Sequence, residues 1–227
     1  MSDEIQAEMR TYYNERAREH DIVYSGKGPA IQQHSAEYIK DVEEILRMAS
    51  GFGDGHLIDI ACGTGFWAPG YARNCNNITF VDQSESMLAE CKSRVEGLGL
   101  NIAPTYIHAD FFDVGLGTSD YDCSLTGFLL SHFMPEQEER FFRKLDTILK
   151  PSARIMIIDS AWSEKRSKHR QKEGIEKRLL NDGRAFRVYK KYFERSEIEE
   201  MLERRMFTPK TFYAGDMLFT AIAERSG

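Results

Sequence analysis

The stretch that decides the fold is Leu57-Ile58-Asp59-Ile60-Ala61-Cys62-Gly63-Thr64-Gly65-Phe66-Trp67. A short apolar strand that contains one acid runs directly into two glycines, which lack a Cβ and let a ligand lie against the main chain. The helix expected to start near Phe66 would present unpaired N–H groups to that ligand. The stretch predicts a strand–loop–helix unit for a nucleotide-like ligand, although turns that bind nothing also use glycine.

Downstream of this stretch, strand-like apolar runs alternate with helical patterns, which is typical of a parallel sheet with crossover helices. The expected strands are residues 57–61, 77–81, 104–108, 123–126 and 154–159, and the helices between them are residues 67–73, 86–98 and 136–149. Four further helices are predicted at residues 2–20, 32–49, 163–181 and 196–205, with a loop of breaker residues at 26–29. The chain is expected to end in a hairpin of residues 210–214 and 217–223.

We expect one α/β domain over residues 1–227, with an N-terminal helical cap at 1–50 and a helical, lid-like insertion at 163–185. The net charge of -6 argues against a surface built for nucleic acid, which is usually basic. No apolar run approaches the roughly 20 residues that span a bilayer, and residues 1–10 lack a signal-peptide core, so a cytoplasmic protein with no membrane partner is predicted. The four cysteines have no metal-site spacing and are interpreted as reduced thiols, so no metal is expected.

Two acids follow the second and third predicted strands. Because ligands of open parallel sheets lie beyond the carboxyl ends of the strands, both acids are candidate contacts. Asp82 lies 17 residues beyond Gly65 and can accept both hydroxyls of a ribose, or it can cap the next helix. Asp110 followed by Phe111 suits an adenine ring, with an acceptor for the amine and an apolar face for the ring.

Taken in order, several short motifs resemble the class I S-adenosylmethionine-dependent methyltransferases, and most closely their small-molecule branch. They are Asp59-x-x-Cys62-Gly63-Thr64-Gly65, Asp82, Asp110-Phe111, Tyr121-Asp122, Leu149-Lys150-Pro151 and an early helix rich in tyrosine. The resemblance implies a Rossmann-like, seven-stranded, mostly parallel sheet whose last strand, residues 217–223, runs antiparallel. It also implies an N-terminal helical lid.

The cofactor implied by this resemblance is S-adenosyl-L-methionine, with S-adenosyl-L-homocysteine as product. Its amino-acid part would pack on the glycine loop near Asp59, its ribose would bind Asp82, and Asp110 and Phe111 would contact the adenine. The full set of implied cofactor contacts is Asp59, Cys62, Gly63, Thr64, Gly65, Asp82, Gln83, Met87, Asp110, Phe111, Thr126, Tyr12 and Tyr24.

His132 follows the fourth predicted strand and is the candidate general base, if the acceptor has a proton to lose. The alternative is that His132 caps a helix or bonds to a backbone carbonyl. Six residues are candidates for the acceptor pocket: Tyr13, Arg16, Phe128, Trp162, Arg166 and Arg170. The aromatic members can equally be core anchors, and the basic run at 165–178 is either a lid for an anionic acceptor or a solvated helix with i,i+3 and i,i+4 ion pairs.

The predicted function is methyl transfer from the sulfonium to a nitrogen, oxygen or carbon atom of a small molecule, by in-line displacement. Alternatives are a nucleic-acid or protein methyltransferase, or a module that binds the cofactor without catalysis. A nucleic-acid substrate is disfavoured because Thr126-Gly127-Phe128-Leu129 lacks the Asn/Asp-Pro-Pro-aromatic loop. An NAD-dependent oxidoreductase leaves Asp59 and Asp110 unexplained. The sequence does not distinguish a monomer from a homodimer.

Overall fold

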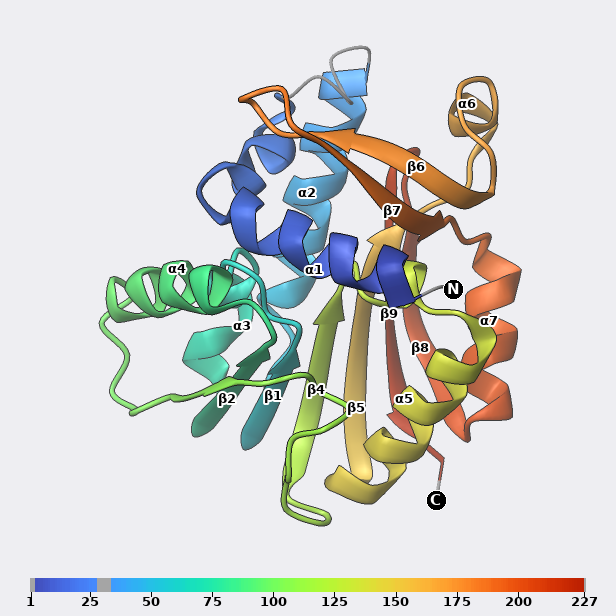
Figure 1. The fold of residues 1–227 in the computed structure, drawn as a ribbon. Helices are drawn as coiled ribbons and strands as arrows, with labels where there is room; N and C mark the ends of the chain where they lie inside the picture. Colours follow the sequence, from blue (N-terminus) through green and yellow to red (C-terminus); the bar gives the residue numbers. More distant parts are fainter. Residues whose placement is uncertain (1–2, 28–33, 227) are drawn as a thin grey trace.

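The computed structural model describes residues 3–27 and 34–226. Parts of the predicted 26–29 loop and the predicted helix start at residue 32 lie outside these residues. The central sheet has seven strands (Figure 1). Across the sheet they are β3 (Thr105–His108), β2 (Asn77–Asp82), β1 (His56–Ile60), β4 (Tyr121–Gly127), β5 (Leu149–Ser160), β9 (Leu218–Arg225) and β8 (Phe207–Ala214).

Strands β3, β2, β1, β4 and β5 pair in parallel, whereas β9 is antiparallel to both of its neighbours. The predicted seven-stranded, mostly parallel sheet with an antiparallel last strand is therefore confirmed. The strand order reverses direction at β1 and β4, because β2 and β3 extend to one side of β1 and β5 to the other. Open parallel sheets place their ligand sites at the carboxyl ends beside such a switch point.

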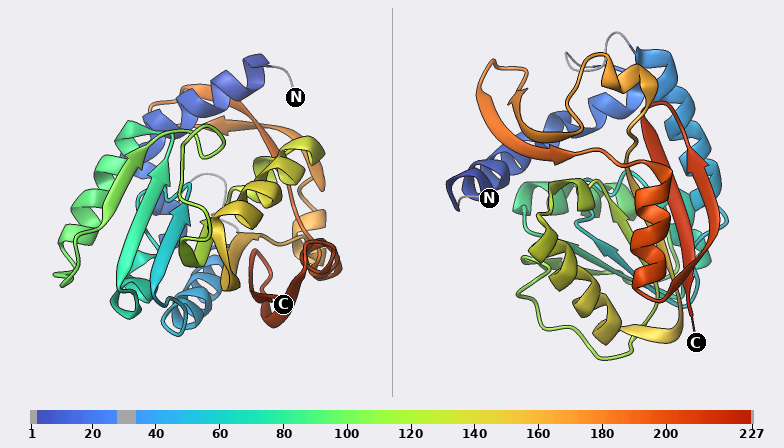
Figure 2. Two further views of the ribbon diagram at one scale, coloured as in Figure 1. Left: turned by 90° about the horizontal axis from the view of Figure 1, so that it is seen from below. Right: turned by 90° about the vertical axis from the view of Figure 1, so that its right-hand side faces the viewer.

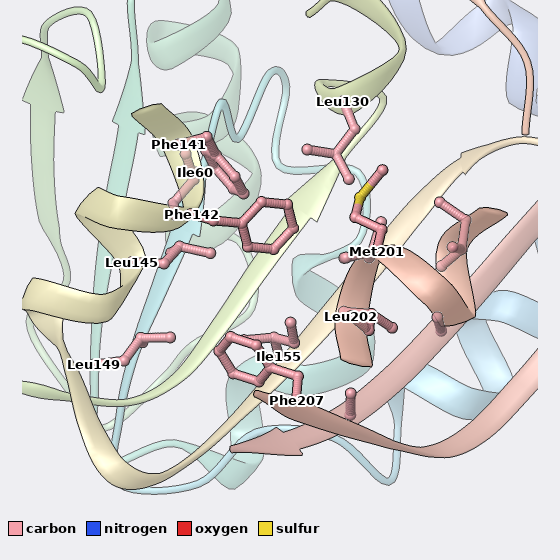
Figure 3. Packing of buried hydrophobic residues seen from close by; sticks show 14 of the residues in the cluster. Ile60, Leu130, Phe141, Phe142, Leu145, Leu149, Ile155, Met201, Leu202 and Phe207 are labelled. Atoms are coloured by element: carbon pink, nitrogen blue, oxygen red, sulfur yellow. The ribbon is translucent and has the colours of Figure 1, made fainter. Parts of the chain in front are cut away.

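Helices cover both faces of the sheet. On one face, α5 (Pro135–Ile148) and α7 (Arg195–Arg204) bury Phe141, Phe142 and Leu202 against strand residues such as Ile155, as Figure 3 shows. On the other face lie α2 (Ser35–Ala49), α3 (Ala68–Tyr71) and α4 (Glu85–Glu96). Alternating apolar residues along β1 serve both layers, which fixes the register of this strand.

Two segments far apart in the sequence lie over the carboxyl ends of the strands, and together we call them the cover. Helix α1 (Asp3–Arg16) continues into the 3-10 helix η1 (Ala17–Ser25), and beside them lies a hairpin of β6 (Glu173–Leu179) and β7 (Ala185–Lys191) (Figures 1 and 2). Ile5, Met9 and Tyr12 of α1 pack with Leu180 and Val188 in a cluster separate from the two main cores. The N-terminal helices thus lie over the edge of the sheet that carries the ligand candidates.

The helix expected at residues 163–181 is wrong, and with it the helical character of the insertion at 163–185. Only α6 (Glu164–Ser167) is helical there, and the hairpin follows. Glu176 pairs with Arg178 at 2.8 Å, an i,i+2 contact on one face of a strand rather than the i,i+3 or i,i+4 contact of a helix. The turn comes at Asn181-Asp182-Gly183, where Gly183 has φ +90°, and Asp182-Gly183 is the sequence signal for it.

Smaller differences concern element ends. Helix α5 stops at Ile148 and β5 starts at Leu149, so the chain passes from helix to strand just before the predicted Lys150-Pro151 stop. Two further short 3-10 helices are η3 (Ala72–Asn74) and η4 (Leu130–His132). All four cysteines are buried and unpaired. Within residues 3–27 and 34–226, no helix combines the length and the apolar character that crossing a membrane requires.

Candidate functional site

The loop after β1 leaves space over its own backbone. Gly63 and Gly65 have φ +54° and +67°, a left-handed conformation that glycine adopts without strain. A Cβ on Gly63 would meet nothing within 4 Å, whereas one on Gly65 would lie 2.8 Å from Sγ of Cys91. The two glycines therefore differ in role: Gly63 leaves an open cradle, and Gly65 lets the loop pack on α4.

This cradle opens into a cavity of about 180 Å³ at the strand ends, which we call the strand-end cavity. Most of the predicted site residues line it: Tyr13, Tyr24, Asp59, Cys62, Gly63, Thr64, Asp82, Gln83, Met87, Asp110, Phe111, Phe128 and His132. Gly65, Thr126 and Tyr12 do not. Thr126 is buried beneath the loop, where its hydroxyl donates to the carbonyl of Ile60 at 3.3 Å.

Asp82 fixes the end of β2 to the glycine loop. Its Oδ2 accepts the N–H of Gly63 and its Oδ1 the N–H of Ser84, each at 2.8 Å. Ser84, and not Asp82, caps α4, because its hydroxyl accepts the N–H of Met87 at 3.1 Å. A carboxylate has about four acceptor positions, so two remain for a ligand. Burial raises the pKa of Asp82, although both N–H contacts oppose the shift.

Asp59 is a buried acid at the carboxyl end of β1. Its side chain is 2% exposed, lines the strand-end cavity and accepts a hydrogen bond from the hydroxyl of Tyr71. No lysine or arginine within the described part of the chain forms an ion pair with it. Burial raises the pKa of Asp59 to about 7, with a further contribution from the nearby carboxylate of Asp82. A ligand cation beside Asp59 would favour its ionised form.

His132 contacts two partners that fix its tautomer. Nδ1 lies 2.7 Å from the carbonyl oxygen of Tyr189, which can only accept, so Nδ1 carries the hydrogen. Nε2 is then the acceptor of the Tyr13 hydroxyl, also at 2.7 Å. Burial, and then the positive charge of Lys190, hold the pKa of His132 well below its usual value. The imidazole is therefore neutral at pH 7, and its unprotonated Nε2 already accepts a hydrogen bond from Tyr13.

A second cavity of about 520 Å³ adjoins the first under the hairpin, and we call it the basic cavity. Tyr13, His20, Tyr24 and Phe128 line both cavities and form the wall between them. Phe128 follows β4 with φ +56°, a strained conformation for a side chain of this size.

Of the other predicted acceptor residues, Arg16, Arg166 and Arg170 line the basic cavity, as does Tyr12. Arg166 is buried and donates to the carbonyls of Ala161 and Met217 at 2.7 and 2.6 Å. Trp162 lines neither cavity and instead packs on Tyr192, with ring centroids 6.1 Å apart. The structure does not bring Trp162 to the site.

Sequence reasoning missed two charged residues. Asp21 of η1 accepts from the Thr64 hydroxyl at 2.6 Å and pairs with Arg94, so it ties the cover to the glycine loop. Lys190 of β7 is buried and lies 3.2 Å from Asp159. An acid in a polar segment gives no signal of such a contact. Lys190 could only be found once the hairpin had been placed over the strand ends.

Residues 57–152 match the family model described as a methyltransferase domain. The chain is also similar to the ubiquinone/menaquinone biosynthesis C-methyltransferase UbiE of Blochmanniella pennsylvanica, with 26% identity over 106 residues. That match covers 45% of this chain and 41% of the relative, so the chain aligns with about two fifths of the relative's length.

Solved structures share the fold over the whole chain. A DhpI–SAH complex has 21% identity and a TM-score of 0.73, covering 100% of this chain and 99% of that one. The 1,6-didemethyltoxoflavin-N1-methyltransferase of Burkholderia thailandensis, with 1,6-didemethyltoxoflavin and S-adenosylhomocysteine bound, has 16% identity and a TM-score of 0.66. It covers 99% of this chain and 90% of its own.

Proposed function

We propose that this chain, which belongs to the class I S-adenosylmethionine-dependent methyltransferases, transfers a methyl group from S-adenosyl-L-methionine to a small-molecule acceptor. The observation that carries the proposal is the strand-end cavity. Three features meet in it at the carboxyl ends of neighbouring strands. They are an open glycine cradle, an acid with free acceptor positions, and a buried acid that has no ion pair in the described part of the chain.

The residues of the strand-end cavity fit the cofactor part by part. The backbone at Gly63 is open to the amino-acid portion, and the unpaired carboxylate of Asp59 would receive its ammonium group. Asp82 has acceptor positions left for the two ribose hydroxyls. Met87 and Phe111 supply apolar surface for an adenine ring. Ligand binding by variants of Asp82 and Asp59 tests these contacts.

When bound, the cofactor supplies a methyl group on a positively charged sulfur, which is displaced in line. The chain's own task is then to hold the acceptor in line and to keep water away. The aromatic wall between the two cavities is suited to both tasks, because Tyr24 and Phe128 border each cavity. Tyr13, fixed by His132, presents its hydroxyl oxygen at the same wall.

His132 is better suited to positioning Tyr13 than to removing a proton. Its pKa lies well below the usual value, and a base of low pKa accepts protons poorly at pH 7. We therefore assign His132 as a positioning residue. An acceptor that needs no strong base, because it is already deprotonated or loses its proton to water, fits this site best.

A small acceptor is supported by the cover over the strand ends. Helix α1 and the β6–β7 hairpin lie across them (Figure 1). The basic cavity, of about 520 Å³, borders the same aromatic wall as the strand-end cavity. A polymer would have to displace α1 to reach the wall.

Calorimetric titration with S-adenosyl-L-homocysteine and with NADH tests the cofactor, using Asp82→Ala as the site variant and Asp113→Ala as the control. Asp113 is exposed and lies outside both cavities. We expect micromolar binding of S-adenosyl-L-homocysteine that is lost in Asp82→Ala and kept in Asp113→Ala. Binding of NADH alone would overturn the proposal.

Catalysis is tested by incubating the protein with S-adenosyl-L-methionine and pooled small metabolites. Release of S-adenosyl-L-homocysteine above the metabolite-free control is the expected result. Binding of the cofactor with no release from any pool would identify a non-catalytic module instead.

A further inference from the structure

The basic cavity concentrates positive charge in a protein that is acidic as a whole. Among the described residues that line it, seven are lysine or arginine and one, Glu19, is an acid. The net charge of the whole chain is -6. The cations come from α1, from Lys27 just beyond η1, from the segment around α6 and from both strands of the hairpin, so the fold gathers them from separate parts of the chain.

The carboxylates around the cavity neutralise only some of these cations. Lys190 pairs with Asp159 at 3.2 Å, and Arg170 and Arg178 share Glu176 at 3.5 and 2.8 Å. Arg16 has no carboxylate within 4 Å in the described part of the chain, and its contact is the Tyr12 hydroxyl at 2.8 Å.

Arg166 is buried, as Lys190 is. Its guanidinium donates to two backbone carbonyls and lies over the Tyr192 ring, 4.4 Å from the ring centroid. It too has no ion pair in the described part of the chain. Arg16 and Arg166 thus reach the cavity without an ion pair in the described part of the chain, and Arg178 has only a carboxylate that it shares with Arg170.

The excess charge acts on the groups at the wall. Burial lowers the pKa of Lys190 to about 8, with Asp159 opposing and Arg178 and Arg166 adding to the effect. Burial raises the pKa of Tyr13, while Arg16 and Arg178 oppose that shift. Arg16 and Arg178 line the basic cavity together with Tyr13. An anion bound by both arginines would therefore occupy the cavity that borders the aromatic wall.

We propose that the basic cavity binds the methyl acceptor through an oxyanion group, a phosphate, phosphonate or carboxylate held by Arg16 and Arg178. This inference rests on the proposed function, because it assigns the acceptor of the same site. Arginine suits such a group, since its planar guanidinium donates two parallel hydrogen bonds to one oxyanion. The aromatic wall would contact the rest of the acceptor, so an organic anion fits better than an inorganic one.

The test uses three probes with the same ring: phenyl phosphate, benzoate and benzyl alcohol. Each is titrated calorimetrically into the protein with and without S-adenosyl-L-homocysteine. The variants are Arg16→Gln and Arg178→Gln. Lys168→Gln is the matched control, because Lys168 belongs to the same basic run but is exposed and lines neither cavity.

We expect phenyl phosphate or benzoate to bind at least tenfold more tightly than benzyl alcohol, and the tighter of the two distinguishes a dianionic from a monoanionic group. Loss of one guanidinium contact should weaken that anion about ten- to hundredfold, and Lys168→Gln should change its affinity less than about twofold. Equal binding of benzyl alcohol, or equal anion affinity in Arg16→Gln and Arg178→Gln, would overturn the inference.

Binding of S-adenosyl-L-homocysteine serves as the separate readout for the proposed function. Each variant should retain it, which also shows that the variant is folded. Anion binding without S-adenosyl-L-homocysteine binding would reject the methyltransferase proposal and keep the oxyanion site. The reverse pattern would reject the oxyanion site alone. If Arg178→Gln does not fold, the anion affinity of Arg16→Gln alone tests the inference, because Arg16 is only half-buried.

Discussion

Replacing Asp59 by asparagine should make the ligand-free protein more stable at pH 8 while weakening its hold on the cofactor. The folded-state pKa of Asp59 is raised from its usual 3.8 to about 7, chiefly by burial. The folded protein therefore holds a proton that the unfolded chain releases. Ionisation costs stability above about pH 4, and the cost is complete above about pH 7.

The size of the effect follows from the shift. About three pKa units correspond to about 4 kcal/mol at pH 8, and the 2% exposure of Asp59 leaves little solvent screening. The amide oxygen of the introduced asparagine would still accept the Tyr71 hydroxyl hydrogen bond, but its NH₂ group would be buried without a partner, at a cost of about 2 kcal/mol. The expected net gain is about 2 kcal/mol at pH 8, falling to about zero at pH 5.

Thermal unfolding at pH 5, 6, 7 and 8 measures this gain. For a chain of this length, about 2 kcal/mol corresponds to a rise of about 4–8 °C in Tm. Asp113→Asn is the control, because Asp113 is exposed and pairs with Arg140 on the surface. A variant Asp59→Asn that is less stable than the parent at pH 8, or equally shifted at every pH, would refute the reasoning.

Three further outcomes are expected. Below pH 7 the parent's affinity for S-adenosyl-L-homocysteine should fall by up to tenfold per pH unit, because the ligand ammonium must displace the proton on Asp59. Asp59→Asn should bind the ligand weakly and with little pH dependence. A parent affinity that does not change with pH would argue against the contact. Gly65→Ala should lower the free energy of unfolding in urea by about 2–4 kcal/mol, because its Cβ would strike Cys91. Gly183→Ala, which has open space around its Cβ, should lower it by only about 1 kcal/mol. Equal losses would contradict the packing role of Gly65. Tyr13→Phe should keep its affinity for S-adenosyl-L-homocysteine within about threefold of the parent's but lower kcat, because the hydrogen bond between Tyr13 and His132 is lost. If kcat is unchanged once an acceptor is known, the pair has no part in the mechanism.

The sheet could be predicted because its signals are local. Strand β2, residues 77–82, is a mostly apolar run that ends in Asp82 and is buried on both faces from Ile78 onward. The site followed from the same rule, since the residues after each parallel strand meet at one edge. Asp59, Asp82 and Asp110 accordingly all line the strand-end cavity.

The hairpin could not be predicted from its charge pattern. Residues 173–179 are rich in Glu, Lys and Arg, which favour helices when considered alone. They form a strand because β7 supplies hydrogen-bond partners and because Val188 and Tyr189 pack against α1. The contacts of Asp21 and Lys190 have the same origin, because each depends on where the cover rests.

The separate small cluster under α1 has a consequence for how ligands enter and leave. Six buried residues hold α1 and the hairpin together, apart from the two larger clusters on either side of the sheet. Local opening costs less free energy where few apolar contacts must be broken. The cover is therefore expected to exchange its amide hydrogens faster than β1 and β4. Each such opening would expose both cavities at once, so that product and spent cofactor leave while the strands that bound them stay in place.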